Sequence, residues 1–289
     1  RTAMHVFRPY QQVPKISIFG SARTQEEHPH YQAAVQFSRL ISQAGWMVIT
    51  GAGGGIMQAG LVGPGKKASF GVAIRLPFET AANQIIAGDE KLVMFRYFFT
   101  RKLMFVKEAH AVALFPGGFG THDEGFEVLT LIQTGKAATI PVVMVDEPNG
   151  EYWAHWNEYV RKQLLGNGMI SPEDLHLYFI TNDPCKAIDH VLTFYRNYDS
   201  HRYVRDRLVI RVKHQPTAEQ VELLNEQFSD LVAKGRIELS GPLDGELAHL
   251  DLPRLKFHFN KRSYGRLRLF IDRLNDFAPP CSTPRASSP

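Results

Sequence analysis

Short apolar runs that end in glycine turns and lead into helical patterns constrain the fold of this chain most. The run at 111–115 has no polar alternation, and it passes through a glycine turn at 116–118 into a helical pattern that ends near residue 136. Runs at 16–19 and 46–50 end in similar turns. Strands without polar alternation are typical of parallel sheets that helices cover on both faces. The sequence therefore predicts an α/β fold with a Rossmann-like, doubly wound parallel sheet.

Strands and helices are expected to alternate up to about residue 195. The expected strands are 16–19, 46–50, 70–76, 111–115, 140–145 and 177–180. The expected helices are 31–44, 56–62, 91–110, the segment that ends near 136, 153–165 and 185–195. The glycine turns fall at the carboxyl ends of strands, where doubly wound sheets bind their ligands.

A change of pattern near 199–206 predicts a domain boundary. We expect a main domain at 1–200, a small basic α+β domain at 201–278 and a disordered tail at 279–289 that is rich in proline and serine. The expected elements of the small domain are strands at 207–213, 236–239 and 255–259 and helices at 217–233 and 263–276. Thr217, with Gln220 three residues later, has the spacing of a helix N-cap.

Composition indicates an ordinary globular protein without a membrane anchor. Hydrophobic residues make up 44% and charged residues 21% of the chain, and no apolar run approaches the roughly 20 residues that span a bilayer. Residues 1–14 lack the apolar region of a signal peptide. Cys185 and Cys281 are isolated and have no metal-binding spacing. We therefore expect free thiols in a reducing compartment, a cytoplasmic protein and no metal site.

The positive charge is concentrated near the C-terminus. The formal net charge is +4, and residues 201–289 hold 15 basic and 11 acidic residues while the rest of the chain is balanced. Seven basic residues lie between 254 and 273, and the stretch 254–276 holds only two acidic residues, Asp272 and Asp276. This pattern fits either a site for an anionic effector or a solvated basic face. We expect no membrane or nucleic-acid partner.

The turn at 116–120 has the composition of an anion-binding cradle. Its glycines allow backbone N–H groups to approach an oxyanion, and the N-terminus of the following helix carries a partial positive charge. Glu124 lies about one turn into that helix, beside the expected anion. Thr121-x-x-Glu124 is also the pattern of a capping box, in which the two side chains bond to the first backbone amides. The pattern alone leaves both roles open, and they can coexist.

The nine residues from Pro116 to Glu124, PGGFGTHDE, resemble the PGGxGTxxE signature of the Lonely Guy family, whose members are often labelled lysine decarboxylases. The resemblance includes Arg101-Lys102 upstream, Gly51–Gly55 with Met57, and the Gly20-Ser21 loop, and it covers about residues 14–196. The segment 98–136 is most similar to the longer bacterial members.

The resemblance implies a nucleoside 5′-monophosphate phosphoribohydrolase. Such an enzyme hydrolyses the N-glycosidic bond of an AMP-like nucleotide or a cytokinin riboside monophosphate, and releases the free base and ribose 5-phosphate. It needs no cofactor. The resemblance also implies at least a homodimer, with the helix of Arg101 near the interface.

The residue types suit this chemistry. A carboxylate can stabilise an oxocarbenium-like ribose and activate water, which assigns that role to Glu124. The guanidinium of Arg101 would favour the ionised carboxylate and could hold a ribose hydroxyl. The expected phosphate-binding residues are Gly118, Gly120 and Thr121, with Gly53, Gly54, Gly55 and Ser21 on the other side. Further expected substrate contacts are Lys102, Gly117 and Met57, together with Glu79 and Asn83 in the long loop.

Two alternatives compete with this hypothesis. The first is a carrier protein of the same fold that binds a nucleotide or molybdenum cofactor without cleaving it, since a carrier needs the phosphate cradle but not the pair Arg101 and Glu124. The second is a true lysine decarboxylase, which requires pyridoxal phosphate and a Schiff-base lysine for which the motif offers no suitable context. The aromatic residues at 95–105 are expected in the core or in a subunit interface.

Overall fold

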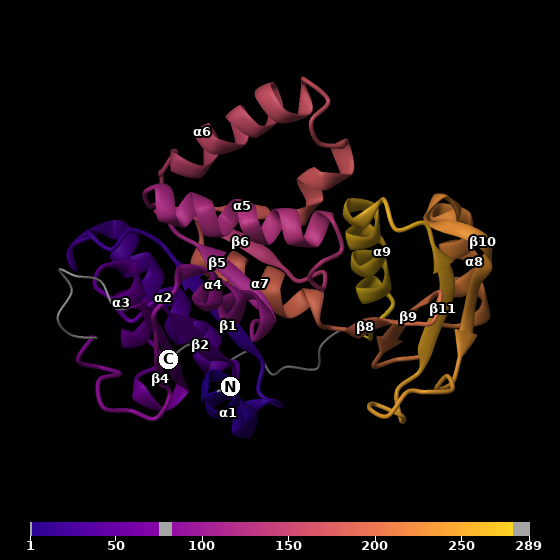
Figure 1. Cartoon of the computed structure of the whole chain (residues 1–289). Coiled ribbons are helices and arrows are strands. Elements are labelled where there is room, and N and C mark those ends of the chain that lie inside the picture. Colours follow the sequence, from indigo (N-terminus) through magenta and orange to yellow (C-terminus); the bar gives the residue numbers. More distant parts are fainter. Residues whose placement is uncertain (1, 75–82, 280–289) are drawn as a thin grey trace, which may run out of the picture. The chain divides into compact units, whose positions relative to one another are not determined.

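The computed structural model describes residues 2–74 and 83–279, which divide into two compact units at residue 192 (Figure 1). The end of the strand expected at 70–76, Glu79 and nearly all of the tail expected at 279–289 lie outside the described residues. Within the described ranges, no helix has the length and apolarity that crossing a membrane requires.

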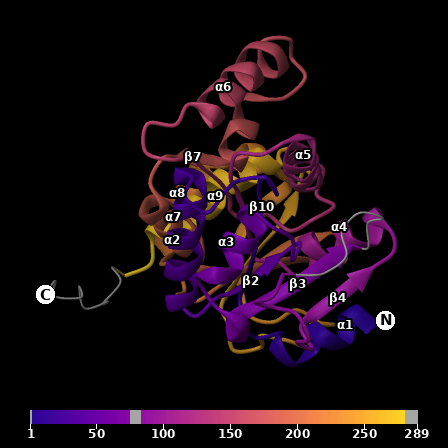
Figure 2. The ribbon, with the colours of Figure 1, turned by 90° about the vertical axis from the view of Figure 1, so that its left-hand side faces the viewer.

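Unit 1 is built on seven parallel strands in the order β4-β3-β2-β1-β5-β6-β7. Figure 2 shows β2, β3 and β4 side by side at one edge. The strands are β1 (Lys15–Phe19), β2 (Met47–Thr50), β3 (Ser69–Ile74), β4 (Leu92–Phe95), β5 (Ala111–Leu114), β6 (Val142–Val145) and β7 (Phe179–Thr181). The strand order reverses between β1 and β5, as in a doubly wound sheet. The predicted fold class is confirmed.

Helices alternate with these strands along the chain. They are α1 (Thr2–Phe7), α2 (Pro29–Gln43), α3 (Ile56–Val62), α4 (Phe98–Lys107), α5 (Phe119–Gln133), α6 (Tyr152–Tyr159) and α7 (Pro184–Phe194). All residues of β1, β2, β3, β5 and β6 are buried. Each fully buried Val, Leu or Ile side chain contributes about 1.5–3 kcal/mol to folding, which explains why these strands lack polar alternation.

The prediction of a helix at 91–110 is wrong for the first part of this segment. Residues Leu92–Phe95 form β4, which pairs in parallel with Gly71–Ile74 of β3, and α4 begins only at Phe98. The apolar residues of this segment fit a helical period, but pairing with the edge of the sheet outweighs that local preference. The helix predicted at 153–165 also changes character, because Val160–Leu165 continues α6 as a π-helix.

Unit 2 is a four-stranded antiparallel sheet in the order β10-β11-β9-β8 with two helices. Its elements are β8 (Tyr198–Val204), β9 (Arg207–Val212), α8 (Ala218–Gln227), β10 (Val232–Ser240), β11 (Arg254–Phe259) and α9 (Tyr264–Asp276). The small α+β appendage is thus confirmed, and the capping box of Thr217 and Gln220 is present. Sequence reasoning missed β8, and it extended the helix of Thr217 to residue 233 although α8 ends at Gln227.

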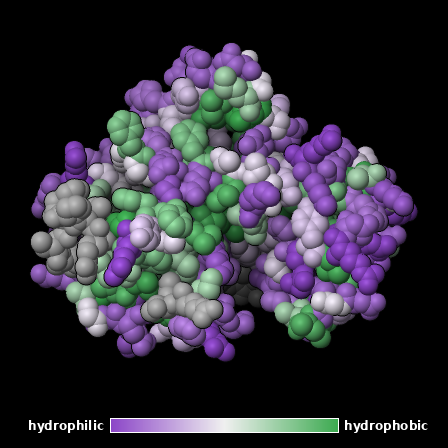
Figure 3. Space-filling model, in the orientation of Figure 1, coloured by the Kyte–Doolittle hydropathy of each residue, from purple (hydrophilic) through white to green (hydrophobic). Residues whose placement is uncertain are grey.

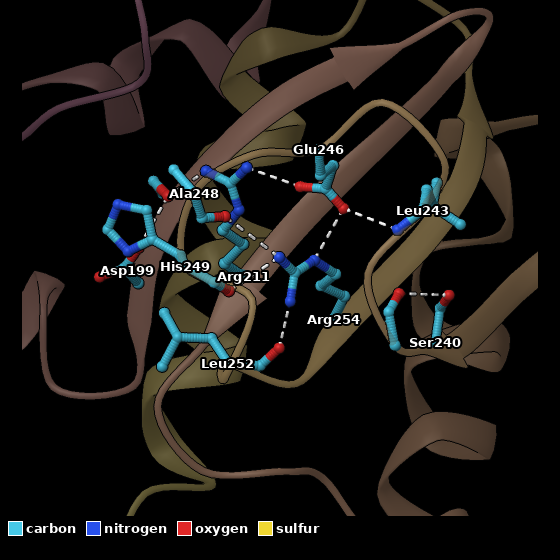
Figure 4. A network of polar contacts seen from close by, with 11 residues as sticks. Asp199, Arg211, Ser240, Leu243, Glu246, Ala248, His249, Leu252 and Arg254 are labelled. Carbon is cyan, nitrogen blue, oxygen red and sulfur yellow. Dashed lines mark hydrogen bonds and ion pairs between the residues drawn. The ribbon is translucent and has the colours of Figure 1, made fainter.

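A buried ion cluster joins the strands of unit 2 to the loop between β10 and β11 (Figure 4). Glu246 accepts a hydrogen bond from Arg211 Nη2 at 2.6 Å and from Arg254 Nε at 2.8 Å. Its carboxylate also accepts the backbone N–H of Leu243 at 3.0 Å. Burial alone would raise the pKa of Glu246, but these hydrogen bonds outweigh it and lower the pKa to about 2. Glu246 is therefore ionised at neutral pH, and its hydrogen bonds fix the loop to β9 and β11.

Other cations of the stretch 254–273 also have acidic neighbours. The pairs are Lys256–Glu238 at 3.6 Å, Arg266–Asp230 at 3.0 Å, Arg268–Asp272 at 3.0 Å and Arg273–Asp276 at 3.4 Å. Two of these carboxylates, Glu238 and Asp230, lie outside the stretch. Counting only the acidic residues within the stretch therefore underestimates how far its positive charge is neutralised. The anionic effector stays a prediction.

Candidate active site at the switch point of the sheet

A cavity of about 870 Å³ opens at the carboxyl ends of β1 and β5, where the strand order reverses. The Gly20-Ser21 loop follows β1, and the turn at 116–118 follows β5. The other lining residues come from α3, α4 and α5 and the segments before them. The lining comprises Phe19, Gly20, Ser21, Ala22, Arg23, Gly51, Met57, Phe98, Arg101 and every residue from Gly117 to Glu124.

The first turn of α5 faces this cavity with free backbone donors. Gly118 is the N-cap of α5, and the helix begins at Phe119. The N–H groups of Gly118, Phe119 and Gly120 have no acceptor among the described residues. A Cβ atom added to Gly118 or Gly120 would meet nothing within 4 Å. The turn therefore offers open space and three unused N–H groups, which is the arrangement that binds anions at helix N-termini.

The capping box that Thr121 and Glu124 could have formed is absent. Thr121 is the third residue of α5, and its N–H donates to Gly118 O at 3.0 Å instead of facing the cavity. The helix begins two residues before Thr121 because Gly118 is extended and serves as N-cap without a side chain. Glu124 is therefore not needed to cap the helix. The Thr121 hydroxyl remains in the cavity lining, whereas its N–H does not remain a free donor.

Glu124 is a buried carboxyl group in the cavity wall. Its side chain is 12% exposed, and Oε2 has no hydrogen-bond partner within the described part of the chain. Burial raises the pKa of Glu124 to about 7, because the opposing charges of Lys102 and Arg101 only partly offset the loss of hydration. The sequence predicted that Arg101 would favour ionisation. Arg101 does so, but burial is the larger effect.

Lys102 lies behind Glu124 and outside the cavity lining. Its ammonium is 2.6 Å from Asp123 Oδ2 and 2.8 Å from Glu127 Oε2, and 4.0 Å from Glu124 Oε1. Burial alone would lower the pKa of Lys102, but these carboxylates raise it above its ordinary value. The structure thus places Lys102 among the acidic residues of α5, where its charge acts on Glu124, and its contact with a substrate stays a prediction.

Arg101 is held against the glycine turn that follows β2. Its Nε donates to Val72 O at 2.9 Å, and its guanidinium carbon lies 5.3 Å from the centre of the Phe105 ring. A Cβ atom at Gly51 would lie 2.3 Å from Arg101 Nη2 and 2.5 Å from Met57 Sδ. Gly51 is therefore the residue of this turn whose lack of a side chain makes room for Arg101.

Gly53, Gly54 and Gly55 stand outside the cavity lining. Gly55 has a φ of +58°, and a Cβ there would lie 2.2 Å from Ser21 O. Ile56 N donates to the same Ser21 carbonyl at 2.9 Å. Gly54 and Gly55 thus pack against the Ser21 loop, whereas Gly53 lies against the side chain of Met57. Ser21 and Met57 do line the cavity, whereas Asn83 does not and instead donates its N–H to Ala52 O at 2.8 Å.

Seven side chains of the lining were not among the predicted site residues. These are Phe19, Ala22, Arg23, Phe98, Phe119, His122 and Asp123. Arg23 had a usable signal, because it is a cation two residues after Ser21 in a loop at the carboxyl end of a strand. Phe119 is 96% exposed at the first position of α5. Within the described residues, no group of three or more His, Cys, Asp or Glu side chains is placed to hold a metal ion.

Comparisons with solved structures find several proteins that are similar to part of this chain. A molybdenum cofactor binding protein from Rippkaea orientalis is 18% identical, with 61% of this chain and 94% of that chain covered and a TM-score of 0.43. The molybdenum cofactor carrier protein of Chlamydomonas reinhardtii is 19% identical over 62% and 96%, with a TM-score of 0.43. DNA processing protein A from Helicobacter pylori is 12% identical over 64% and 83%, with a TM-score of 0.41. Similarity at this level supports no inference about function.

A comparison with curated proteins finds no match. A comparison with protein families finds one match. The matched segment covers β3 to β7, with α4 and α5, but it includes neither the Ser21 loop nor unit 2. Residues 54–191, which include Arg101 and the whole stretch from Pro116 to Glu124, match the family described as "Possible lysine decarboxylase".

Proposed function

We propose that unit 1 is a phosphoribohydrolase that cleaves the N-glycosidic bond of a nucleoside 5′-monophosphate. The base would be an adenine, plain or N6-modified as in cytokinins. The observation that carries the proposal is the position of Glu124. A buried carboxyl with a pKa of about 7 lines the same cavity as three unused N–H groups at the start of α5. A carboxyl that is poised near neutrality beside an anion site is typical of general acid–base catalysis.

The cradle at the start of α5 suits the 5′-phosphate. The N–H groups of Gly118, Phe119 and Gly120 would donate to it, with the hydroxyls of Ser21 and Thr121 as further donors. Arg23 lines the same cavity and supplies the positive charge that a phosphate dianion requires. The match to the lysine decarboxylase family does not favour that reaction, because Lys102 is engaged with Asp123 and Glu127 outside the cavity.

The reaction then proceeds at the ribose between Glu124 and Arg101. As the bond from C1′ to the base nitrogen breaks, positive charge develops on the ribose ring, which the carboxylate of Glu124 stabilises. The carboxylate accepts a proton from water, whose oxygen bonds to C1′, and this proton then passes to the departing base nitrogen, which restores the ionised carboxylate. The products are the free base and ribose 5-phosphate. Arg101 would hold a ribose hydroxyl and would favour the ionised form of Glu124.

The direct test is release of base from a panel of nucleotides. The full chain is incubated with the 5′-monophosphates of the common nucleosides and of an N6-modified adenosine, and free base is followed by chromatography. We expect release from at least one purine monophosphate and, because the cradle selects for phosphate, no comparable release from the matching nucleoside. Tight binding of one nucleotide with no release of base from any would instead favour the carrier function.

We extend the proposal to a homodimer in which a second copy covers the exposed side of α4. Met104 and Phe105 of this helix are buried, whereas Phe99 is 71% and Leu103 58% exposed. A second cavity, of about 520 Å³, lies between these side chains and α5. Figure 3 shows apolar surface near the position of α4. Adjacent exposed apolar side chains of this size are typical of protein interfaces.

The variant Phe99→Glu is expected to shift the protein from dimer to monomer, since it would place a charge in an apolar contact. Sedimentation velocity of the wild type and the variant measures the change. Tyr159→Glu is the control, because Tyr159 on α6 is also an exposed aromatic residue, at 51%, but it does not line this second cavity. A wild-type protein that sediments as a monomer at all concentrations contradicts this part of the proposal.

A further inference from the structure

We propose that Tyr152 and His122 are positioning residues for the phosphate site, because they hold the carbonyl of Gly117 away from the cavity. This inference rests on the proposed function only in taking the ligand to be a phosphate ester. Tyr152 is the first residue of α6, and 35 positions separate it from Gly117, so no local pattern links the two. Its hydroxyl nevertheless donates directly to Gly117 O.

The directions of the two hydrogen bonds follow from the groups involved. A carbonyl oxygen can only accept, so the single hydroxyl proton of Tyr152 is directed to Gly117 O. His122 Nε2 lies 2.6 Å from the same hydroxyl oxygen and must therefore be the donor in that contact. Burial raises the pKa of Tyr152 and lowers that of His122. At neutral pH, His122 is thus the neutral tautomer with its proton on Nε2.

The consequence for the cradle follows from the planarity of the peptide bond. In a trans peptide, the C=O of one residue and the N–H of the next point in opposite directions. Fixing the Gly117 carbonyl toward Tyr152 therefore directs the Gly118 N–H the other way. Gly118 lines the cavity whereas Tyr152 does not.

The two neighbouring carbonyls are held in the same manner. Pro116 O accepts the N–H of Ser21 at 3.1 Å, and Gly118 O accepts the N–H of Thr121 at 3.0 Å. Three consecutive carbonyls are thus occupied by donors from the protein. Carbonyl oxygens that faced the cavity would repel a phosphate, whereas the N–H groups attract it. Tyr152 provides the only side-chain donor among these three contacts.

Tyr152 is itself fixed by buried groups. The next residue, Trp153, donates its N–H to Asp146 Oδ2 at 3.2 Å, and Asp146 is buried at the end of β6. The Tyr152 ring packs edge-on against Trp153 with ring centres 4.8 Å apart, and it stacks on His122 with centres 5.8 Å apart. The hydroxyl therefore reaches Gly117 from a rigid base, as a positioning residue requires.

The test is Tyr152→Phe, which removes the hydroxyl and keeps the ring. Calorimetric titration with ribose 5-phosphate is expected to show affinity about tenfold weaker than wild type, the size of one lost hydrogen bond. Affinity for adenosine, which has no phosphate, should stay within about twofold. Tyr178→Phe is the matched control, because Tyr178 also loses a partly buried bond, to Asn157 Oδ1 at 2.7 Å, outside the cavity. It should bind ribose 5-phosphate as the wild type does.

A second pair of variants tests His122. His122→Leu removes the donor that orients the Tyr152 hydroxyl and is expected to weaken ribose 5-phosphate binding about threefold, whereas His122→Gln keeps an N–H donor and should restore it. The inference fails if Tyr152→Phe binds ribose 5-phosphate as tightly as wild type, or if adenosine binding weakens equally. A wild type that binds ribose 5-phosphate but cleaves no nucleotide would overturn the proposed function alone.

Discussion

Glu124→Gln is expected to lower kcat for nucleotide hydrolysis about a thousandfold, within the range for loss of a general acid–base group. Glutamine keeps the size of the side chain and its place in the cavity wall, but it can neither accept a proton from water nor offset positive charge on the ribose. Binding energy from the phosphate cradle is untouched, so the affinity for nucleotide should change by less than about threefold. Single-turnover kinetics with saturating nucleotide separates the two quantities.

Glu127→Gln is the matched control for this prediction. Glu127 lies on the same helix as Glu124 and also contacts Lys102, but it does not line the cavity. Its kcat should stay within about threefold of wild type, because only second-order changes in the charge near Glu124 remain. If Glu124→Gln retains wild-type turnover, or if both variants lose activity alike, Glu124 is not the catalytic carboxylate.

Glu124→Gln should also be more stable than the wild type above neutral pH. The folded-state pKa of Glu124 is raised from 4.5 to about 7, so the folded state binds more protons than the unfolded state between these values. The wild type therefore loses stability as pH rises from about 4.5 to 7, and glutamine does not. The gain for Glu124→Gln should be near zero at pH 4 and reach about 1–3 kcal/mol at pH 8. Urea unfolding at the two pH values measures it.

The parts of the fold that could be predicted from sequence are those with a local physical signal. Residues 16–19 and 111–115 lack polar alternation because both faces of the strand are buried, and that alone indicates a parallel sheet. The strand Leu92–Phe95 could not be found in this way. Its identity depends on hydrogen bonds to Gly71–Ile74 of β3, and its apolar residues fit a helix equally well. β8 was missed for the same reason, since pairing with β9 organises its mostly polar sequence.

The candidate site also has parts that the sequence predicts and parts that it does not. The glycine turn, Glu124 and Arg101 could be assembled from motifs, and the structure brings them to one cavity. The start of α5 could not be placed, because Gly118 caps the helix without a side chain and leaves no pattern to detect. Lys102 is 21 positions from Asp123 and 25 positions from Glu127 in the sequence, and Tyr152 is 35 positions from Gly117. Such contacts exist only once the elements have packed.

Glu246→Gln is expected to destabilise unit 2 by about 3–5 kcal/mol, the usual effect of removing one member of a buried ion pair. The side chains of Glu246 and Arg254 are both 0% exposed, and Arg211 lies within 2.6 Å of the same carboxylate. Neutral glutamine would leave two guanidinium groups buried without a counter-charge. The loop between β10 and β11 would also lose an acceptor for the Leu243 N–H.

The position of the tryptophans allows this effect to be assigned to unit 2. Trp46, Trp153 and Trp156 all belong to unit 1, so fluorescence follows that unit, while hydrogen exchange of amides in β9 and β11 follows unit 2. Glu246→Gln should speed exchange in β9 and β11 by more than a hundredfold, as expected for about 3 kcal/mol, and leave the fluorescence transition in place. Glu222→Gln is the control, because its ion pair with Arg236 is more than half exposed and should contribute less than about 1 kcal/mol.

Acid provides an independent test of the same cluster. The pKa of Glu246 is lowered from 4.5 to about 2 in the folded state, so the unfolded state binds more protons between these values. The contribution of Glu246 is therefore complete above pH 4.5 and is lost as the pH falls toward 2. Exchange in β9 and β11 of the wild type should accelerate over that range and approach the rate of Glu246→Gln. Equal protection of the two proteins at pH 7 would show that the buried charges are compensated in some other way.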